Sequence, residues 1–161
     1  GISGSSGAGA GSGISKNSDG SVSALGGAVT VTGHNAEYVA GKAEELYANS
    51  PTFKAMVDKA VAEGESATIN TEISPEGGSS GLSCLGAEVE EVSLRMDANA
   101  NDETYLAFIS HELGHAFGNY DDGEGTIGSS IGSNQHFNAQ VGHEMGYLDT
   151  PQAVTYGTLW G

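Results

Sequence analysis

The amino-acid sequence predicts an α+β fold in which a small, mostly antiparallel sheet packs against three helices. Three segments alternate apolar and polar residues with the period of a β-strand, and three others repeat apolar residues with the period of an α-helix. The chain has 161 residues, which is enough for one domain with a hydrophobic core. We therefore expect a single compact domain built from these elements.

The N-terminal segment has the composition of a flexible linker. It is rich in glycine and serine and includes the run Gly-Ala-Gly-Ala-Gly-Ser-Gly at residues 7–13. The alternating, β-branched segment at residues 28–32 is typical of a short strand that ends at Gly33. The sequence thus predicts an arm or linker over residues 1–27 and a folded domain over residues 28–161.

Two helices are expected next, joined at Ser50. Apolar residues recur at helical spacing from Asn35, the expected N-cap, to Asn49. Ser50 and Pro51 then begin a second helix as its cap and first helical residue, and Gly64 ends it. The apolar stripes of both helices are expected to pack in the core.

Two further strands and a third helix complete the predicted core. Residues 67–74 and 87–96 alternate well enough to be strands, and we expect them to pair antiparallel. The third helix begins near Asn101 or Asp102, with acidic residues at its positive end, and ends around Gly118. The remaining chain is rich in Gly, Ser and Asn and has little periodicity, so functional loops are expected there.

The charge balance excludes two classes of partner. Five Lys and Arg against 21 Asp and Glu give a net charge of −16, whereas nucleic acids and anionic membranes require clustered cations. No run of about 18 apolar residues is present, so no membrane span is expected. The single cysteine, Cys84, cannot form an internal disulfide and is expected to be a small buried side chain.

The most informative motif lies near the end of the third predicted helix, at His111-Glu112-Leu113-Gly114-His115. The two histidines are one helical turn apart, so their imidazoles can hold one ion with Glu112 beside them. Zinc lowers the pKa of a bound water to about 7, and a carboxylate can take the proton as that water attacks a carbonyl. The pattern predicts amide hydrolysis with Glu112 as the base. The alternative is a structural pair of surface or core histidines.

A catalytic zinc also needs a third protein ligand and one open position. The downstream candidates are Asp121, Asp122, Glu124, His136, His143 and Glu144. Reading on from His111 gives HExxHxxGxxD, in which Gly118 can end the helix in a left-handed turn so that Asp121 faces the ion. The alternative role for Asp121 is that residues 121–124 form a solvated or calcium-binding turn, in which case Ca²⁺ would be a second ion bound at that turn.

The stretch from His111 to Asp121 resembles the metzincin clan of zinc peptidases, whose motif has Gly at this position and His or Asp three residues later. The resemblance implies that His111, His115 and Asp121 are zinc ligands. It also implies that Glu112 is the general base.

A second feature is similar to the same clan. Met145-Gly146-Tyr147 looks like the Met-turn, in which a Met supports the zinc site from below and a Tyr two residues on approaches the ion. The resemblance implies that Tyr147 stabilises the oxyanion. The alternative is that Met145 simply fills space in the core.

The order of elements over residues 29–157 resembles that of the small HExxH effector and toxin peptidases that bacteria export, the NleD-like group. This resemblance implies a secreted bacterial enzyme that cuts a protein of a host or a competitor. The chain departs from those enzymes before Val141-Gly142, where it has Asn138-Ala139-Gln140 in place of acidic residues. That difference leaves the downstream ligand open.

Together these features predict a zincin-like α+β domain in which the sheet packs on the active-site helix and two further helices. We expect a monomeric zinc-dependent endopeptidase whose protein or peptide substrate lies along a sheet edge by strand addition. Two alternatives stay open. One is a zinc-dependent hydrolase of a non-peptide amide, and the other is a non-catalytic metal-binding or adhesion module.

Overall fold

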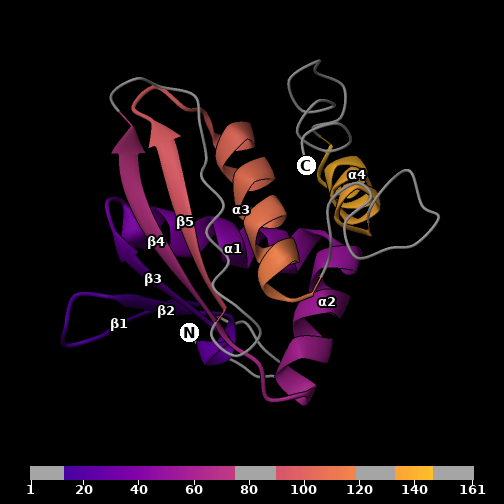
Figure 1. Ribbon diagram of the computed structural model, residues 1–161, viewed down its shortest axis with the longest axis horizontal. Coiled ribbons are helices and arrows are strands. Elements are labelled where there is room, and N and C mark those ends of the chain that lie inside the picture. The colour runs from indigo at the N-terminus through magenta and orange to yellow at the C-terminus, as the bar shows by residue number, and fades with distance from the viewer. Residues whose placement is uncertain (1–12, 75–89, 119–132, 147–161) are drawn as a thin grey trace.

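The computed structural model describes residues 13–74, 90–118 and 133–146 and has an α+β fold (Figure 1). Its strands are β1 (Ser15–Lys16), β2 (Val22–Ala24), β3 (Val29–Gly33), β4 (Ala67–Ser74) and β5 (Glu90–Asp97). Its helices are α1 (Ala36–Asn49), α2 (Pro51–Ala62), α3 (Asp102–Ala116) and α4 (Ser133–Met145), with a short 3-10 turn, η1, at Leu25–Gly27. The α+β class expected from the sequence is confirmed.

The strands form one mixed sheet in the order β1-β2-β3-β4-β5. β2 pairs antiparallel with β1 and β3, whereas β4 pairs parallel with both β3 and β5. The expectation of a mostly antiparallel sheet, with β4 and β5 antiparallel, is therefore wrong. Alternation at period two reports the face that a side chain occupies but not the direction of the strand. The segment 75–89 also has the dozen or more residues that a parallel crossover needs.

The sheet begins inside the segment that was expected to be a linker. Val22 and Ala24 of β2 point into the core, with 3% and 1% of their surface exposed. Leu25 is fully buried, and its backbone N–H donates to the Glu44 carboxylate at 2.7 Å. Burial of these apolar side chains offsets the entropy lost when the glycine-rich chain is ordered. The folded domain therefore includes residues 13–27, and the rest of the expected arm lies outside the described residues.

Helices α1 and α3 pack against one face of the sheet, and α2 and α4 pack on these two helices (Figure 1). The core lies between the sheet and the helices. The buried face of the sheet contributes Val29, Val31, Ile69, Val92, Leu94 and Met96. The opposite face is polar, and Asn70 links three strands there. Its Oδ1 accepts from the Thr32 hydroxyl at 2.5 Å, and its Nδ2 donates to Glu91 at 2.6 Å. The sheet therefore has one face for the helices and one polar face.

Two of the three helices that were expected from the sequence begin at capping side chains. Ser50 Oγ accepts from the Phe53 N–H at 3.1 Å where α2 begins, and Asn101 Oδ1 accepts from the Thr104 N–H at 2.9 Å where α3 begins. The exception is Asn35. Its φ of 56° lies in the left-handed region, and its side chain makes no capping bond to α1 in the described structure.

Helix α4 is not predicted by the sequence. Its residues are rich in Ser, Asn and Gln, and their intrinsic helix propensity is low. Val141 is fully buried and Asn138 is 2% exposed, so packing against α2 and α3 stabilises a helix that propensity alone would not. The expectation of loops after Gly118 is therefore wrong over Ser133–Met145. The rest of that region lies outside the described residues.

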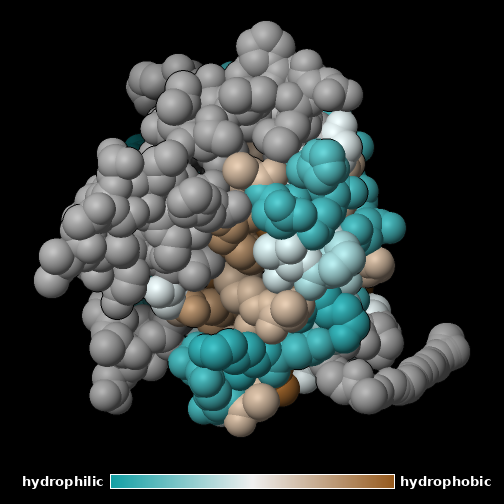
Figure 2. All heavy atoms as spheres, turned by 90° about the vertical axis from the view of Figure 1, so that its right-hand side faces the viewer, coloured by the Kyte–Doolittle hydropathy of each residue, from teal (hydrophilic) through white to brown (hydrophobic). Residues whose placement is uncertain are grey.

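The face that α2 and α4 present is mainly hydrophilic around a narrow strip of apolar side chains (Figure 2). Within the described ranges, Tyr38 and Val61 are the only exposed large apolar side chains, with 37% and 40% of their surface accessible. No helix in these ranges is both long enough and apolar enough to cross a membrane. Apart from that strip, the exposed large apolar side chains of the described residues stand singly on the surface.

Candidate metal centre

Helix α3 carries the HExxH motif into the interior of the protein. The helix begins after the Asn101 cap with Asp102 and Glu103 in its first turn, where carboxylates interact favourably with the helix dipole. Every residue from Tyr105 to Ala116 is buried. α3 contacts β5, α1 and α4. The motif therefore lies on the enclosed second half of a helix that directly follows β5.

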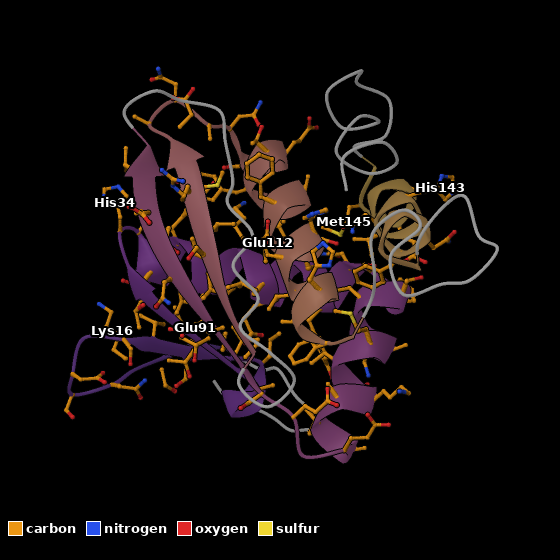
Figure 3. All side chains as sticks on the ribbon, viewed as in Figure 1. Lys16, His34, Glu91, Glu112, His143 and Met145 are labelled. Carbon is orange, nitrogen blue, oxygen red and sulfur yellow. The ribbon has the colours of Figure 1, made fainter. Side chains whose placement is uncertain are left out.

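His111 and His115 lie on the same face of α3. Their ring centroids are 4.7 Å apart, and the ring planes meet at 86°. His111 is 3% exposed, His115 is 9% exposed, and Glu112 between them is 1% exposed. Figure 3 shows Glu112 at the centre of the molecule. Two imidazoles one helical turn apart suit a single metal ion.

Burial of these three ionisable side chains separates the competing interpretations of the motif. A carboxylate that leaves water loses several kcal/mol of solvation, so buried charges are normally paired or bind a metal. Clusters of this kind are typical of functional sites. The burial of His111 and His115 excludes the interpretation in which they are ordinary surface histidines. A structural pair of core histidines is the alternative that remains.

Side chains of α1 hold the start of α3. The Tyr38 hydroxyl donates to the Asp102 carboxylate, and Lys42 Nζ lies 3.5 Å from the same carboxylate. The Tyr38 and Tyr105 rings pack edge to face with centroids 4.9 Å apart. The hydrogen bond from Tyr38 and the charge of Lys42 lower the pKa of Asp102. These contacts fix the end of the helix opposite the motif.

Helix α4 lies beside both α3 and α2 (Figure 1). The hydroxyl of Ser110, the residue before His111, donates to Asn138 Oδ1 at 2.7 Å. Phe137, the neighbour of Asn138, faces Phe53 of α2 with ring centroids 6.4 Å apart. The contact between α3 and α4 cannot be predicted from the sequence, because no spacing rule connects Ser110 with a residue 28 positions later.

Glu144, one of the candidate zinc ligands, is bound to the start of α2. Its Oε1 accepts from the Ser50 hydroxyl at 2.6 Å and from the Thr52 N–H at 3.0 Å. Its Oε2 accepts from the Thr52 hydroxyl at 2.7 Å and from Gln140 at 3.1 Å. Burial raises the pKa of this carboxyl, but the hydrogen bonds outweigh burial and bring the pKa down to about 2. Glu144 therefore caps α2, and these contacts hold it away from the histidine pair.

The other candidate ligands fall into two groups. His143 is exposed and lies on the side of α4 turned away from α3, two residues after the buried Val141 (Figure 3). The candidates whose side chains lie outside the described residues are Asp121, Asp122, Glu124 and His136. Within the described residues, no three His, Cys, Asp or Glu side chains form a metal-binding group. A third zinc ligand would therefore have to come from outside the described side chains.

The residues expected to support the zinc site lie at two chain turns. Gly118 follows α3 with a φ of 105°, which confirms the expected left-handed end of the motif helix. Met145 ends α4 and is half-buried against the core on the side that faces α3 (Figure 3). Met145 is thus the last residue of α4, and the chain turns at the next residue, Gly146, whose φ is 82°. Tyr147 lies outside the described residues.

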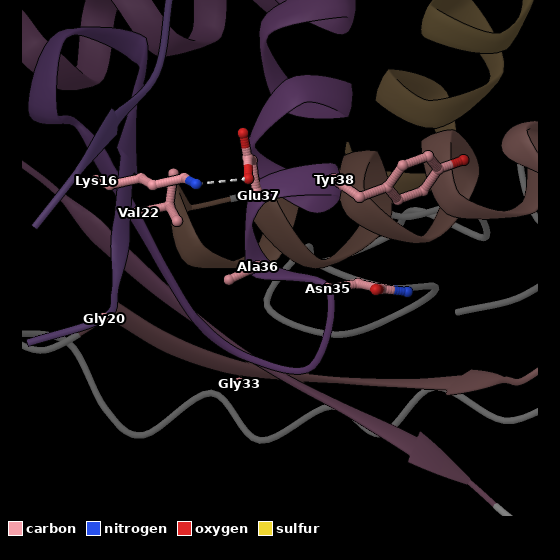
Figure 4. A pocket seen from close by; sticks show the side chains of 8 residues that line it. All are labelled: Lys16, Gly20, Val22, Gly33, Asn35, Ala36, Glu37 and Tyr38. Carbon is pink, nitrogen blue, oxygen red and sulfur yellow. Dashed lines mark ion pairs between the residues drawn. The ribbon is translucent and has the colours of Figure 1, made fainter.

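A separate open pocket lies where α1 begins (Figure 4). Gly33, Asn35 and Tyr38 line it, and Lys16 Nζ forms an ion pair with Glu37 Oε1 at 3.1 Å on its wall. None of its lining residues comes from α3 or α4. The pocket is therefore distinct from the motif, and the charges of Lys16 and Glu37 offset each other.

Comparison with known proteins does not assign a family to the chain. No family model matches it, and no curated protein or solved structure shows significant similarity to it. The residues of α3 and their surroundings are therefore the features that bear on function.

Proposed function

We propose that the protein is a zinc-dependent endopeptidase of zincin-like architecture with its active site on α3. The observation that carries the proposal is the buried HExxH face, in which the His111 and His115 ring centroids lie 4.7 Å apart and Glu112 is 1% exposed. His111 and His115 would hold the ion, with Asp121 as the proposed third ligand. This donor set fits zinc, because two imidazoles and one carboxylate form a known ligand set of catalytic zinc.

Glu112 is the proposed general base and general acid. Zinc held by these ligands would polarise the scissile carbonyl and lower the pKa of a bound water. Glu112 takes a proton from that water as its oxygen bonds to the carbonyl carbon, and returns the proton to the amine as the C–N bond breaks. Tyr147 is the proposed donor to the oxyanion. The burial of the motif keeps bulk water away from the carboxylate.

Strand β5 is the proposed binding edge for the substrate. In the described sheet it pairs with β4 alone, and the chain passes from it into α3. An extended peptide that adds to this edge through backbone hydrogen bonds would run beside the motif helix. This geometry supports a protein or peptide substrate over a small amide.

The proposed setting of the enzyme follows from the resemblance and the charge. The similarity of the motif and layout to exported bacterial peptidases supports secretion. The net charge of −16 argues against a nucleic-acid partner. We propose that the enzyme acts as a secreted monomer.

Metal content tests the proposed site. The wild-type protein should carry about one zinc ion per chain and cleave casein, and a chelator should remove this activity until zinc is added back. His115→Ala should lose most of the bound zinc. His143→Ala changes an exposed histidine of α4 and is the matched control, with zinc and activity at wild-type levels. Equal zinc in both variants would contradict the proposed site.

The third ligand is tested by the same measurement. Asp121→Ala should lose zinc, because three protein ligands hold a catalytic ion, whereas Asp122→Ala should retain it. Retention of zinc by Asp121→Ala together with its loss from Glu124→Ala would move the ligand to Glu124.

A further inference from the structure

We infer that Ser110 and Asn138 form a positioning pair that holds the turn of α3 carrying His111. Ser110 Oγ donates to Asn138 Oδ1 at 2.7 Å, and the two residues are 0% and 2% exposed. The inference rests on the proposed function and adds to it two residues that lie outside the HExxH motif. Neither residue is expected to touch zinc or substrate.

The surface of α3 around Ser110 explains why a polar contact is needed there. Ala107 and Gly114 lie about one turn before and after Ser110 on the same side of the helix, and both are small. Small side chains on this side of α3 give α4 little relief to engage, so apolar packing across the α3–α4 contact specifies the relative position of the two helices only weakly. A hydrogen bond has a set length and direction, so a buried one specifies how two helices sit against each other.

Helix α4 can hold α3 in position because the other side of α4 is fixed by side-chain contacts with α2. Glu144 accepts from the Ser50 and Thr52 hydroxyls at 2.6 and 2.7 Å, and Phe137 faces Phe53. Phe137 and Glu144 are seven residues apart and so share one side of α4. Asn138 is rotated from that side toward α3. α4 therefore links the start of α2 to the motif turn of α3.

The position of the pair along α3 matters for the metal. Metal ligands need to be held within about 0.5 Å and 10–20° of their binding geometry. The Tyr38–Asp102 contact fixes α3 roughly two and a half turns before His111. The Ser110–Asn138 hydrogen bond lies one residue from His111, so it restrains His111 much more directly than the Tyr38–Asp102 contact does.

Zinc affinity, measured by competition with a chromogenic chelator, tests the pair. Ser110→Ala and Asn138→Ala should each weaken zinc binding by about tenfold, the low end for outer-shell partners of metal ligands. Ser110→Thr keeps the hydroxyl and should restore affinity close to the wild-type value. Val141→Ala removes apolar packing from the same helix and is the matched control. It should lower the melting temperature of the metal-free protein but not the zinc affinity.

The outcomes separate this inference from the proposed function. Zinc binding by Ser110→Ala at wild-type affinity would overturn the positioning role while leaving the zinc site intact. An equal loss of affinity in Val141→Ala would overturn it too, because general packing would then explain the effect. If Asn138→Ala does not fold, Ser110→Ala decides the question, since alanine is well tolerated within a helix. Absence of zinc from the wild-type protein would instead refute the proposed function.

Discussion

Replacement of Glu112 by Gln is expected to abolish peptide-bond hydrolysis while zinc stays bound. A positioned general acid or base contributes about 10²–10⁴-fold to a rate, and an amide at this position neither takes nor returns a proton. His111 and His115 are unchanged in the variant, so the metal content should remain at about one zinc per chain. Initial rates of casein cleavage and metal analysis on the same preparations measure both effects.

Glu103→Gln is the matched control for this variant. It makes the same chemical change in the first turn of α3 at an exposed position, so its activity and zinc content should equal those of the wild type. Gln is close to isosteric with Glu, so the buried site at residue 112 should keep its packing. Casein cleavage by Glu112→Gln at the wild-type rate would refute the mechanism. A binding module would show no turnover in any variant.

The elements that the sequence predicts well are those with strong local signals. Ser50 and Pro51 mark the start of α2, and Asn101 marks the start of α3, because their side chains or ring geometry satisfy the helix terminus itself. The bounds of β4, Ala67–Ser74, follow from alternation alone. The strand β2 was missed because glycine and serine surround its short apolar pattern, Val22-Ser23-Ala24.

The features that the sequence does not predict depend on contacts between distant residues. Parallel pairing of β4 with β5 is decided by how the chain crosses over, which alternation does not report. Helix α4 depends on burial of Asn138 and Val141 between other helices. At the site, the helical period brings His111 and His115 to one face, but no local rule links Ser110 to Asn138.

The role of Glu144 also depends on contacts with distant residues, so the sequence does not predict it. Its place after the motif made it a candidate ligand, yet Ser50 and Thr52, 94 and 92 residues away, bind its carboxylate. Glu144→Gln is therefore expected to lower the free energy of unfolding at pH 7 by about 2 kcal/mol, the scale of hydrogen bonds to a charged group. Urea unfolding of the variant and the wild type measures the difference. Glu37→Gln, which breaks the exposed pair with Lys16, is the control and should have little effect.

The effect of Glu144 should depend on pH in a defined direction. Its pKa is lowered from 4.5 to about 2 in the folded protein, so the stabilisation is complete above pH 4.5 and is lost as the pH falls toward 2. The difference in unfolding free energy between wild type and Glu144→Gln should fall to roughly half near pH 3. A difference that stays constant down to that pH would show that the carboxylate charge is not what stabilises α4.

Zinc content of the same variant separates the two roles that Glu144 could have. A helix cap predicts lower stability with zinc retained, because the carboxylate lies on the α2 side of α4. A zinc ligand predicts the reverse, with zinc lost and the metal-free protein about as stable as the wild type. The cap assignment therefore predicts a loss of stability without a loss of zinc, and the ligand assignment predicts a loss of zinc without a loss of stability. The contacts with Ser50 and Thr52 favour the cap and leave Asp121 as the proposed ligand.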